Sequence, residues 1–432
     1  MSAFLFRDAN ILGEQRADIL VEGAQIRQVG TDLPLSAGSG VQEVDARGLV
    51  ALPGLVDLHT HLREPGGSDA ETVDTGTAAA AKGGYTCVFA MANTTPTQDC
   101  PAVVEQVLDL GHQAGRVDVY PVGAVTKNLA GKELSDLRAM HNSRAAVNVF
   151  SDDGKCVFDP LLMRQALEIV RDFDGVIAQH SQEPRLTADS QMNESYLAQE
   201  LGLKGWPTVA EEMIIARDIL LSAYLDVRVH VCHLSSATAV ELVRWGKSQG
   251  ARISAEVTPH HLFLTEEELR GRDPLFKVNP PLRSQKDVAA VRAGLADGTI
   301  DLVGTDHAPH PRRLKDCDFE CGAFGMIGLE TALPVVATTM VQSGKMAWRD
   351  LARVMSVTPA KIGKAKGQGE EIAAGSTANL CFVAPDASWI VNRESQVSRS
   401  DNTPFVGKEL VGQVRHTCYR GKLTVLAGQL QF

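Results

Sequence analysis

Between residues 51 and 365, short apolar runs alternate with amphipathic stretches such as Val209–Tyr224 and Ser236–Lys247, and this alternation constrains the fold more than any other feature. Continuous apolar runs are typical of parallel strands buried on both faces, and eight strand–helix units make up a (β/α)8 barrel. The sequence therefore predicts an α/β fold of the TIM-barrel type, with a doubly wound open sheet as the alternative. The eight runs are Leu55–Leu58, Thr86–Met91, Val117–Val122, Ala146–Phe150, Gly175–Ala178, Val227–Cys232, Arg252–Val257 and Leu302–Val303.

Both ends of the chain differ from this middle part, because they consist of short strand-like runs separated by turns. Near the start, Ala17–Gly30 contains two apolar-rich runs with a hairpin turn at Glu22-Gly23. Residues 378–384 and 422–427 have the same character near the other end. We predict one small β domain, formed by residues 1–50 and 366–432, beside a barrel formed by residues 51–365.

Charge and composition exclude several classes of function. The formal net charge is −11 and no Lys/Arg block resembles a nucleic-acid footprint, so we expect no nucleic-acid partner. The acidity argues against binding to anionic membranes, and the sequence has neither a signal-peptide pattern nor a long apolar span. The eight cysteines form no CxxC pair and are expected to be reduced thiols, with nothing near Cys317 and Cys321 to support a metal or a disulfide. We expect a cytoplasmic protein.

Imidazole and carboxylate side chains follow the predicted strands at the points where they end. His59 and His61 are two residues apart, so on a strand their side chains point to the same face. One such pair is often structural, but further candidates recur at other strand ends, the edge at which barrel active sites form. These ligand types suit zinc, so the sequence predicts a catalytic metal site. The recurring candidates are His180, His233, Asp306 and the pair Asp152-Asp153.

Six motifs are distributed over nearly the whole chain: Pro53–Gly66, Ala90–Pro96, Phe150–Gly154, Val278–Arg283, Gly304–His310 and Ala323–Gly325. Together they resemble the amidohydrolase superfamily and, within it, the dihydroorotases of the bacterial class I type. This resemblance implies a metal-dependent barrel with a small β domain. It also implies the reversible, zinc-dependent cyclisation of N-carbamoyl-L-aspartate to (S)-dihydroorotate and water, in de novo pyrimidine (UMP) biosynthesis.

The resemblance also implies a set of metal ligands. One zinc would be held by two histidines with a nearby aspartate, and a second zinc by the two other histidines, with one aspartate bridging. Many amidohydrolases bridge with a carboxylated lysine, but the matching strand here carries Asn148, which favours a dihydroorotase over a hydantoinase or allantoinase. Whether one or two zinc ions are held stays open, with two favoured. The implied ligands are His59, His61, Asp306, His180, His233 and, as the bridge, Asp153 rather than Asp152.

Binding of an anionic substrate by an acidic protein requires local positive charge. Arg63 lies two residues after His61 and can clamp a carboxylate through two parallel hydrogen bonds; the alternative is a surface ion pair with Glu64 or Asp69. Asp306 is the predicted catalytic residue, which shuttles a proton from water to the leaving nitrogen. Asn93 and Asn279 have an alternative interpretation as turn residues. By resemblance the substrate-binding residues are His61, Arg63, Asn93, Asn279, His310, Phe324 and Gly325.

Several expectations about the whole protein accompany this interpretation. The enzymatic alternative is a related cyclic amidase. The non-enzymatic alternative is a silent scaffold for aspartate carbamoyltransferase, although such proteins typically lack the metal ligands that are present here. We expect a homo-oligomer, with a dimer favoured, and association with aspartate carbamoyltransferase is possible. Residues Pro311–Gly322 form a long polar loop, either a mobile lid or an ordinary solvated loop, and Glu266–Glu268 is expected to be the first turn or exposed face of a helix.

Overall fold

Eight parallel strands form a closed barrel in the computed structural model, which describes residues 3–34 and 40–431. A three-stranded sheet, β6-β7-β8, and a five-stranded sheet, β15-β14-β13-β10-β9, are joined by parallel bridges from Gly123 to Phe150 and from Thr60 to His307. The predicted barrel is confirmed and the open sheet is excluded. The strands are β6 (Leu55–Thr60), β7 (Tyr85–Ala90), β8 (Asp118–Pro121), β9 (Val149–Phe150), β10 (Val176–Gln179), β13 (Arg228–Val231), β14 (Ile253–Val257) and β15 (Leu302–Val303).

Each barrel strand matches one predicted run, although β9 is shorter than predicted. The run was expected to begin at Ala146, but this residue has φ +46°, which no extended strand can include. The strand therefore begins at Val149. Asn148 precedes it, half-buried, and donates a hydrogen bond to the carbonyl of Ala146 rather than lining a site.

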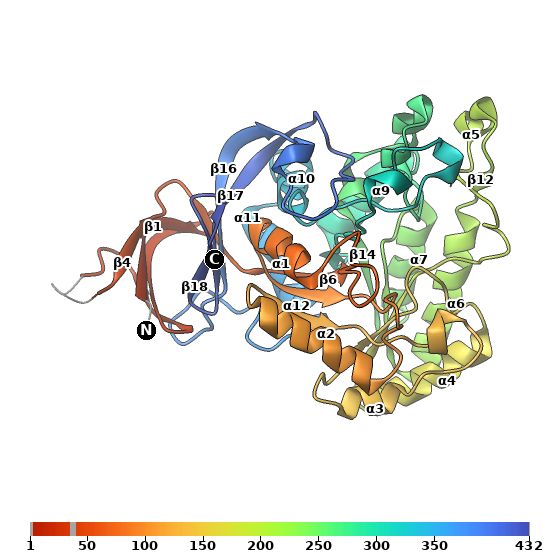
Figure 1. The fold of residues 1–432 in the computed structure, drawn as a ribbon, viewed down its shortest axis with the longest axis horizontal. Helices are drawn as coiled ribbons and strands as arrows, with labels where there is room; N and C mark the ends of the chain where they lie inside the picture. Colours follow the sequence, from red (N-terminus) through yellow and green to blue (C-terminus); the bar gives the residue numbers. More distant parts are fainter. Residues whose placement is uncertain (1–2, 35–39, 432) are drawn as a thin grey trace.

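Helices cover the outside of the barrel (Figure 1). Side-chain oxygens cap the first turns of several of them; Ser236, for example, accepts a hydrogen bond from the backbone of Ala239 at the start of α7. Residues Glu266–Gly271 form a 3-10 helix, which confirms the expected first turn at Glu266–Glu268. The helices are α1 (Val73–Lys82), α2 (Pro101–Ala114), α3 (Leu137–Asn142), α4 (Pro160–Arg171), α5 (Tyr196–Leu201), α6 (Val209–Leu225), α7 (Ala237–Ser248), α8 (Pro259–Phe263), α9 (Gln285–Asp297), α10 (Ala332–Val336), α11 (Trp348–Ala352) and α12 (Thr358–Gly363).

A nine-stranded sheet combines both ends of the chain (Figure 1, red and blue strands). Strand β5 pairs antiparallel with β16, and the rings of Phe6 and Phe382 stack 4.4 Å apart in the core of this sheet. The predicted hairpin at Glu22-Gly23 joins β2 to β3. The domain limits at residues 50 and 366 stay a prediction. The strands are β1 (Ala3–Ile11), β2 (Gln15–Glu22), β3 (Gln25–Gly30), β4 (Gln42–Asp45), β5 (Val50–Pro53), β16 (Leu380–Ile390), β17 (Glu409–Tyr419), β18 (Lys422–Leu426) and β19 (Gln429–Leu430).

Two excursions leave these layers. Strands β11 (Met192–Asn193) and β12 (Gly205–Trp206) form a small separate sheet after β10. Residues 396–405, between β16 and β17, leave the β sheet and make hydrogen bonds to the loops that follow β6 and β15. Among the described residues, no helix has the length and apolarity needed to cross a bilayer.

Candidate active site

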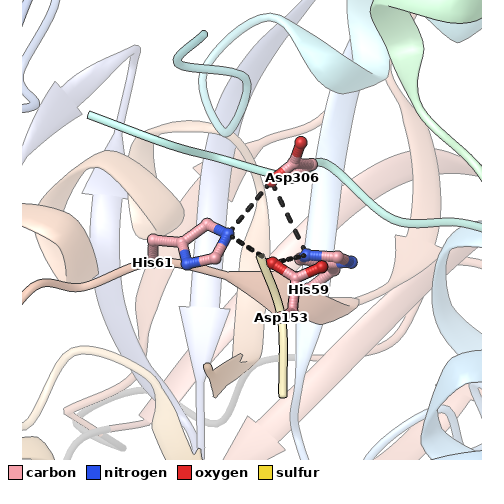
Figure 2. A group of neighbouring side chains, drawn as sticks. All are labelled: His59, His61, Asp153 and Asp306. Atoms are coloured by element: carbon pink, nitrogen blue, oxygen red, sulfur yellow. Dashed lines mark hydrogen bonds and ion pairs between the residues drawn. The ribbon is translucent and has the colours of Figure 1, made fainter. Parts of the chain in front are cut away.

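Four side chains from three separate strand ends converge at the mouth of the barrel (Figure 2). His59 and His61 come from the end of β6, Asp153 follows β9, and Asp306 follows β15. The Nε2 atom of His61 lies 3.3 Å from Asp153 Oδ2 and 3.1 Å from Asp306 Oδ1. For His59 Nε2 the corresponding distances are 3.4 Å and 3.6 Å. All four side chains are buried, so the geometry matches the convergence predicted for the first ligand group.

A second group shares the same aspartate. His180 Nδ1 and His233 Nε2 lie 3.0 Å and 3.1 Å from Asp153 Oδ1, and 2.8 Å from each other. Asp153 therefore directs Oδ2 toward the β6 histidines and Oδ1 toward His180 and His233. A carboxylate that faces two ligand groups in this way has the geometry of a bridge.

The neighbouring Asp152 faces away from both groups. Its Oδ1 accepts hydrogen bonds from the backbone N–H groups of Val125 and Thr126, at 2.8 Å and 2.9 Å, and its Oδ2 accepts from the Thr126 hydroxyl. Asp152 thus fixes the turn after β8. This placement agrees with the expectation that Asp153, and not Asp152, faces the metal ligands.

The imidazoles of His61 and His180 are oriented by hydrogen bonds at the ring nitrogen that faces away from the carboxylates. His61 Nδ1 is hydrogen-bonded to Asn93 Oδ1 at 2.8 Å, and His180 Nε2 to Gln182 Oε1 at 2.7 Å. These contacts leave His61 Nε2 and His180 Nδ1 as lone-pair donors that face the carboxylates. The buried Nε2 of His59 has no hydrogen-bond partner among the described residues. An orphaned imidazole nitrogen beside two carboxylates fits a divalent cation held by nitrogen and oxygen ligands.

Glu256, on β14, is a functional residue that the sequence analysis missed. Its Oε1 accepts hydrogen bonds from His59 Nδ1 at 2.5 Å and from the backbone N–H of His233 at 3.2 Å, and its Oε2 accepts from His230 Nε2 at 3.1 Å. A Cβ atom at Gly304 would lie 2.5 Å from Oε2, so glycine there leaves room for the carboxylate. The available signal was a glutamate inside an otherwise apolar barrel run.

A cavity of about 350 Å³ opens beside the four converging side chains. Every residue that the sequence analysis assigned to substrate binding lines it. Lys155, which was not predicted, lines it as well and forms no ion pair among the described residues. The lining residues are His61, Arg63, Asn93, Leu129, Asp153, Gly154, Lys155, His180, Asn279, Asp306, Ala308, His310, Phe324 and Gly325.

Arg63 is the main fixed cation in this cavity. Its Nε donates a hydrogen bond to the carbonyl of Pro309 at 3.2 Å, and no carboxylate pairs with its guanidinium among the described residues. Glu64 instead accepts from the backbone N–H of Val73, and Asp69 pairs with Arg313, so the surface ion pair considered above is absent. Burial lowers the pKa of Arg63 to about 10, which leaves it charged at neutral pH.

The two predicted asparagines have different surroundings. Asn93 orients His61 through its amide oxygen, so it is more than a turn residue. Asn279 donates a hydrogen bond to Gln182 Oε1 at 3.1 Å, while its own buried Oδ1 has no partner among the described residues. Gln182, which the sequence analysis missed, therefore connects His180 with Asn279. Its position two residues after a strand-end histidine was the available signal.

His310, Phe324 and Gly325 form one wall of the cavity. His310 Nε2 donates to the carbonyl of Phe324 at 2.8 Å, and burial, with the nearby charge of Arg63, lowers the pKa of His310 to about 3. The imidazole is therefore neutral, and in this arrangement its only N–H is already donated. Gly325 has φ +141°, and a Cβ atom there would lie 2.8 Å from His310 Nε2, so only glycine permits this close approach.

The loop Pro311–Gly322 is tied to the protein along its length. Lys315 Nζ donates to the carbonyls of Pro274 and Lys277, at 2.9 Å and 3.1 Å. Lys277 Nζ in turn donates to the carbonyls of Phe319 and Glu320, at 2.8 Å and 3.0 Å. Because both lysines and Phe319 are buried, movement of this segment as a lid would break all these contacts. The geometry favours the ordinary loop over the mobile lid.

Comparisons with known proteins agree with the motifs and the fold. A protein-family model described as Dihydro-orotase-like matches residues 48–239. Among solved structures, the L-hydantoinase (dihydropyrimidinase) from Arthrobacter aurescens superimposes with a TM-score of 0.88 at 24% identity, covering 100% of this chain and 98% of that chain. A dihydropyrimidinase from Brevibacillus agri superimposes with a TM-score of 0.83 at 22% identity, covering 99% and 96%. At such identity these structures support the fold alone.

Relatives of higher identity carry one name. A protein named dihydroorotase from Streptomyces coelicolor is 56% identical over 430 residues, which cover 100% of both chains. Another of this name, from Mycobacterium tuberculosis, is 51% identical over 428 residues, or 99% of each chain. Because identity above 50% extends over 99–100% of the sequence, the chain belongs to the dihydroorotase family.

Proposed function

We propose that this protein is a dihydroorotase, which catalyses the reversible cyclisation of N-carbamoyl-L-aspartate to (S)-dihydroorotate and water in pyrimidine biosynthesis. The observation that carries the proposal is the convergence of two ligand groups on Asp153 beside a cavity that contains an unpaired arginine. The complete set of ligand side chains argues against a silent scaffold. The relatives named dihydroorotase, at 51–56% identity, favour this substrate over hydantoin or allantoin.

Zinc is the proposed cofactor, with two ions per subunit favoured. Bound zinc would act as a Lewis acid and lower the pKa of a water molecule toward about 7. The donor set of four imidazoles and two carboxylates supports zinc. The division of Asp153 between the two groups supports two ions. The proposed ligands of the first ion are His59, His61, Asp153 and Asp306, and those of the second are Asp153, His180 and His233.

Asp306 is the proposed proton shuttle. It lines the cavity, and its Oδ1 lies 3.1 Å from His61 Nε2. As a carboxylate, Asp306 accepts a proton from the water that attacks the ring amide carbonyl. It then delivers that proton to the ring nitrogen as the C–N bond breaks. In the cyclisation direction it takes the proton from the carbamoyl nitrogen and returns it to the departing oxygen.

The remaining lining residues are proposed to bind the anionic substrate. The guanidinium of Arg63 and the free amide end of Asn93 lie on the wall next to His61, where they can hold the carboxylate. The unpartnered Oδ1 of Asn279 can accept a hydrogen bond from a ring N–H. His310, Phe324 and Gly325 form another part of the wall. Because the Nε2–H of His310 is already donated to Phe324, the unprotonated Nδ1 can contact the substrate only as a hydrogen-bond acceptor.

The decisive experiment is a turnover assay on zinc-loaded protein with dihydroorotate, hydantoin and allantoin, together with metal analysis. We expect ring opening of dihydroorotate at alkaline pH and ring closure of N-carbamoyl-L-aspartate at acidic pH, with about two zinc ions bound. Asp306→Asn should abolish turnover while zinc content falls little, because the other ligands remain. Preferential turnover of hydantoin, or wild-type rates in Asp306→Asn, would contradict the proposal.

We also propose a homo-oligomer, with a dimer favoured, a cytoplasmic location, and a possible association with aspartate carbamoyltransferase. Light scattering on the purified protein tests the first, and cell fractionation the second. Co-elution with the carbamoyltransferase of the same organism tests the third. A monomer at micromolar concentration would contradict the proposed assembly without affecting the catalytic proposal.

A further inference from the structure

Asn402 is a buried residue from the C-terminal part of the chain whose side chain reaches the wall of the cavity. Its Oδ1 accepts a hydrogen bond from the backbone N–H of His310 at 3.1 Å. Its Nδ2 donates to the carbonyls of Ala308 and Gly325, at 3.1 Å and 3.2 Å. Because one partner is a donor and two are acceptors, these contacts fix the orientation of the amide.

All three partners of this amide belong to residues that line the cavity. Ala308 and His310 lie on the loop that follows β15, and Gly325 lies after the tied loop Pro311–Gly322. The backbone carbonyl of Asn402 also accepts from Ile327 N–H, at 3.2 Å. The side chain and the backbone carbonyl of Asn402 therefore join the two backbone segments that form the wall, one around Ala308 and His310 and the other around Gly325.

The segment around Asn402 is also held to the loop that follows β6, the strand next to β15 in the barrel. Arg399 N–H donates to Glu71 Oε1 at 3.0 Å, and the Ser400 hydroxyl donates to the carbonyl of Ala70 at 2.6 Å. Ala70 and Glu71 follow β6, the strand that carries His59 and His61. Residues 398–402 thus bridge the loops after β6 and β15, so Asn402 has a fixed base.

We propose that Asn402 is a positioning residue for substrate binding, which sets the distance between the His310 backbone and Gly325 and thereby the shape of the cavity wall. This inference rests on the proposed function, because the ligand concerned is the cyclic substrate. Asn402 touches neither the predicted metal ligands nor the reacting atoms. Its loss should therefore weaken substrate binding more than it slows the chemical step.

The test compares Asn402→Asp and Asn402→Ala with the control Asn392→Asp. The aspartate variant keeps the acceptor for His310 N–H but places an oxygen opposite two carbonyls. The alanine variant removes all three bonds without adding charge. Asn392 is exposed between β16 and this excursion, and its side chain caps a short 3-10 helix, so its variant controls for the added charge. We expect KM for dihydroorotate to rise roughly tenfold or more in both Asn402 variants, with a smaller change in kcat and unchanged zinc content.

Hydrogen exchange provides a readout that does not depend on turnover. In Asn402→Ala, the peptides that cover residues 305–327 should exchange at least roughly tenfold faster, while peptides from β6 and β10 keep their protection. Unchanged KM together with unchanged exchange in an active protein would overturn the inference. The inference would also be overturned if kcat fell only in proportion to a loss of folded protein or of bound zinc. If the wild-type protein fails to act on dihydroorotate, the proposed function falls, and the exchange of 305–327 still decides the positioning role.

Discussion

Glu256 connects the two ligand groups through one buried carboxylate. It fixes the tautomer of His59 by accepting from Nδ1, which leaves Nε2 free for a metal. It also holds the backbone N–H of His233, a residue whose φ of +33° lies in the left-handed region. Such strained residues persist only where their surroundings hold them. Since the hydrogen bonds from His230 and His59 outweigh burial and keep the pKa of Glu256 well below its ordinary range, the carboxylate is ionised.

Glu256→Gln should weaken metal binding without unfolding the protein. Glutamine keeps the shape but loses the charge that makes His59 a better ligand, so we expect roughly 10- to 100-fold weaker zinc affinity. Competition with a fluorescent zinc chelator measures this. Glu212→Gln is the matched control, because Glu212 bonds only to the Ser236 hydroxyl at 3.3 Å and lies outside the ligand groups. Equal zinc affinities in the two variants would remove Glu256 from the metal site.

Arg63→Met should act on binding rather than on chemistry. The guanidinium has no carboxylate partner among the described residues, so its loss leaves no buried anion behind. It removes the contact with the substrate carboxylate and the hydrogen bond to the Pro309 carbonyl. A hydrogen bond to a charged group contributes roughly 1.5–3 kcal/mol, so KM for dihydroorotate should rise about 10- to 100-fold. Steady-state kinetics with Arg63→Lys as comparison measures this, and lysine should recover part of the loss. An unchanged KM in the methionine variant contradicts the clamp.

At the scale of elements, the contacts of Lys277 and Lys315 explain why a polar loop is held in place. Buried lysines usually pair with carboxylates, but the side-chain nitrogens of these two donate hydrogen bonds to backbone carbonyls instead. Lys277 Nζ also lies 4.6 Å from the centre of the Phe324 ring, a cation–π contact that joins the loop to the cavity wall. Burial, and then the charge of Lys277, lower the pKa of Lys315 to about 7.

This shift predicts how stability depends on pH. Lys315 has a lower pKa in the folded protein than in the unfolded chain. The unfolded state therefore binds more protons between about pH 7 and 10.5, and stability should rise with pH across that window. Lys315→Met should flatten this rise, by a few kcal/mol at most. Thermal unfolding at pH 7.0 and 9.5 measures the difference, with the exposed Lys286→Met on α9 as control. Equal slopes in all three proteins would mean that folding does not lower the pKa of Lys315.

For the molecule as a whole, rules that act within a short stretch of sequence predicted most of the barrel. Continuous buried runs marked all eight of its strands, and parallel strands necessarily bring residues such as His59 and Asp306 to the same edge. Strand β17 was missed although its buried residues alternate, because Gly412 and Arg415 interrupt the apolar pattern. Asn402 had no local signal at all, since its partner His310 is 92 residues away and only the folded chain brings them together.

The overall charge leads to the last prediction. A protein with net charge −11 repels an anionic substrate at long range, so cations at the mouth must reverse the field locally. Lys155 is exposed on the cavity rim without an ion pair among the described residues, so it suits this role. Lys155→Gln should lower kcat/KM for dihydroorotate several-fold at about 10 mM salt. The loss should shrink at about 300 mM, because screening weakens the attraction that only the wild type has.

Lys361→Gln, an exposed change on α12 away from the cavity, alters the net charge equally and separates local attraction from total charge. If both variants lose the same activity, the total charge and not the position of Lys155 accounts for the loss. If the Lys155 effect is independent of salt, Lys155 acts through contact or structure and not through its field.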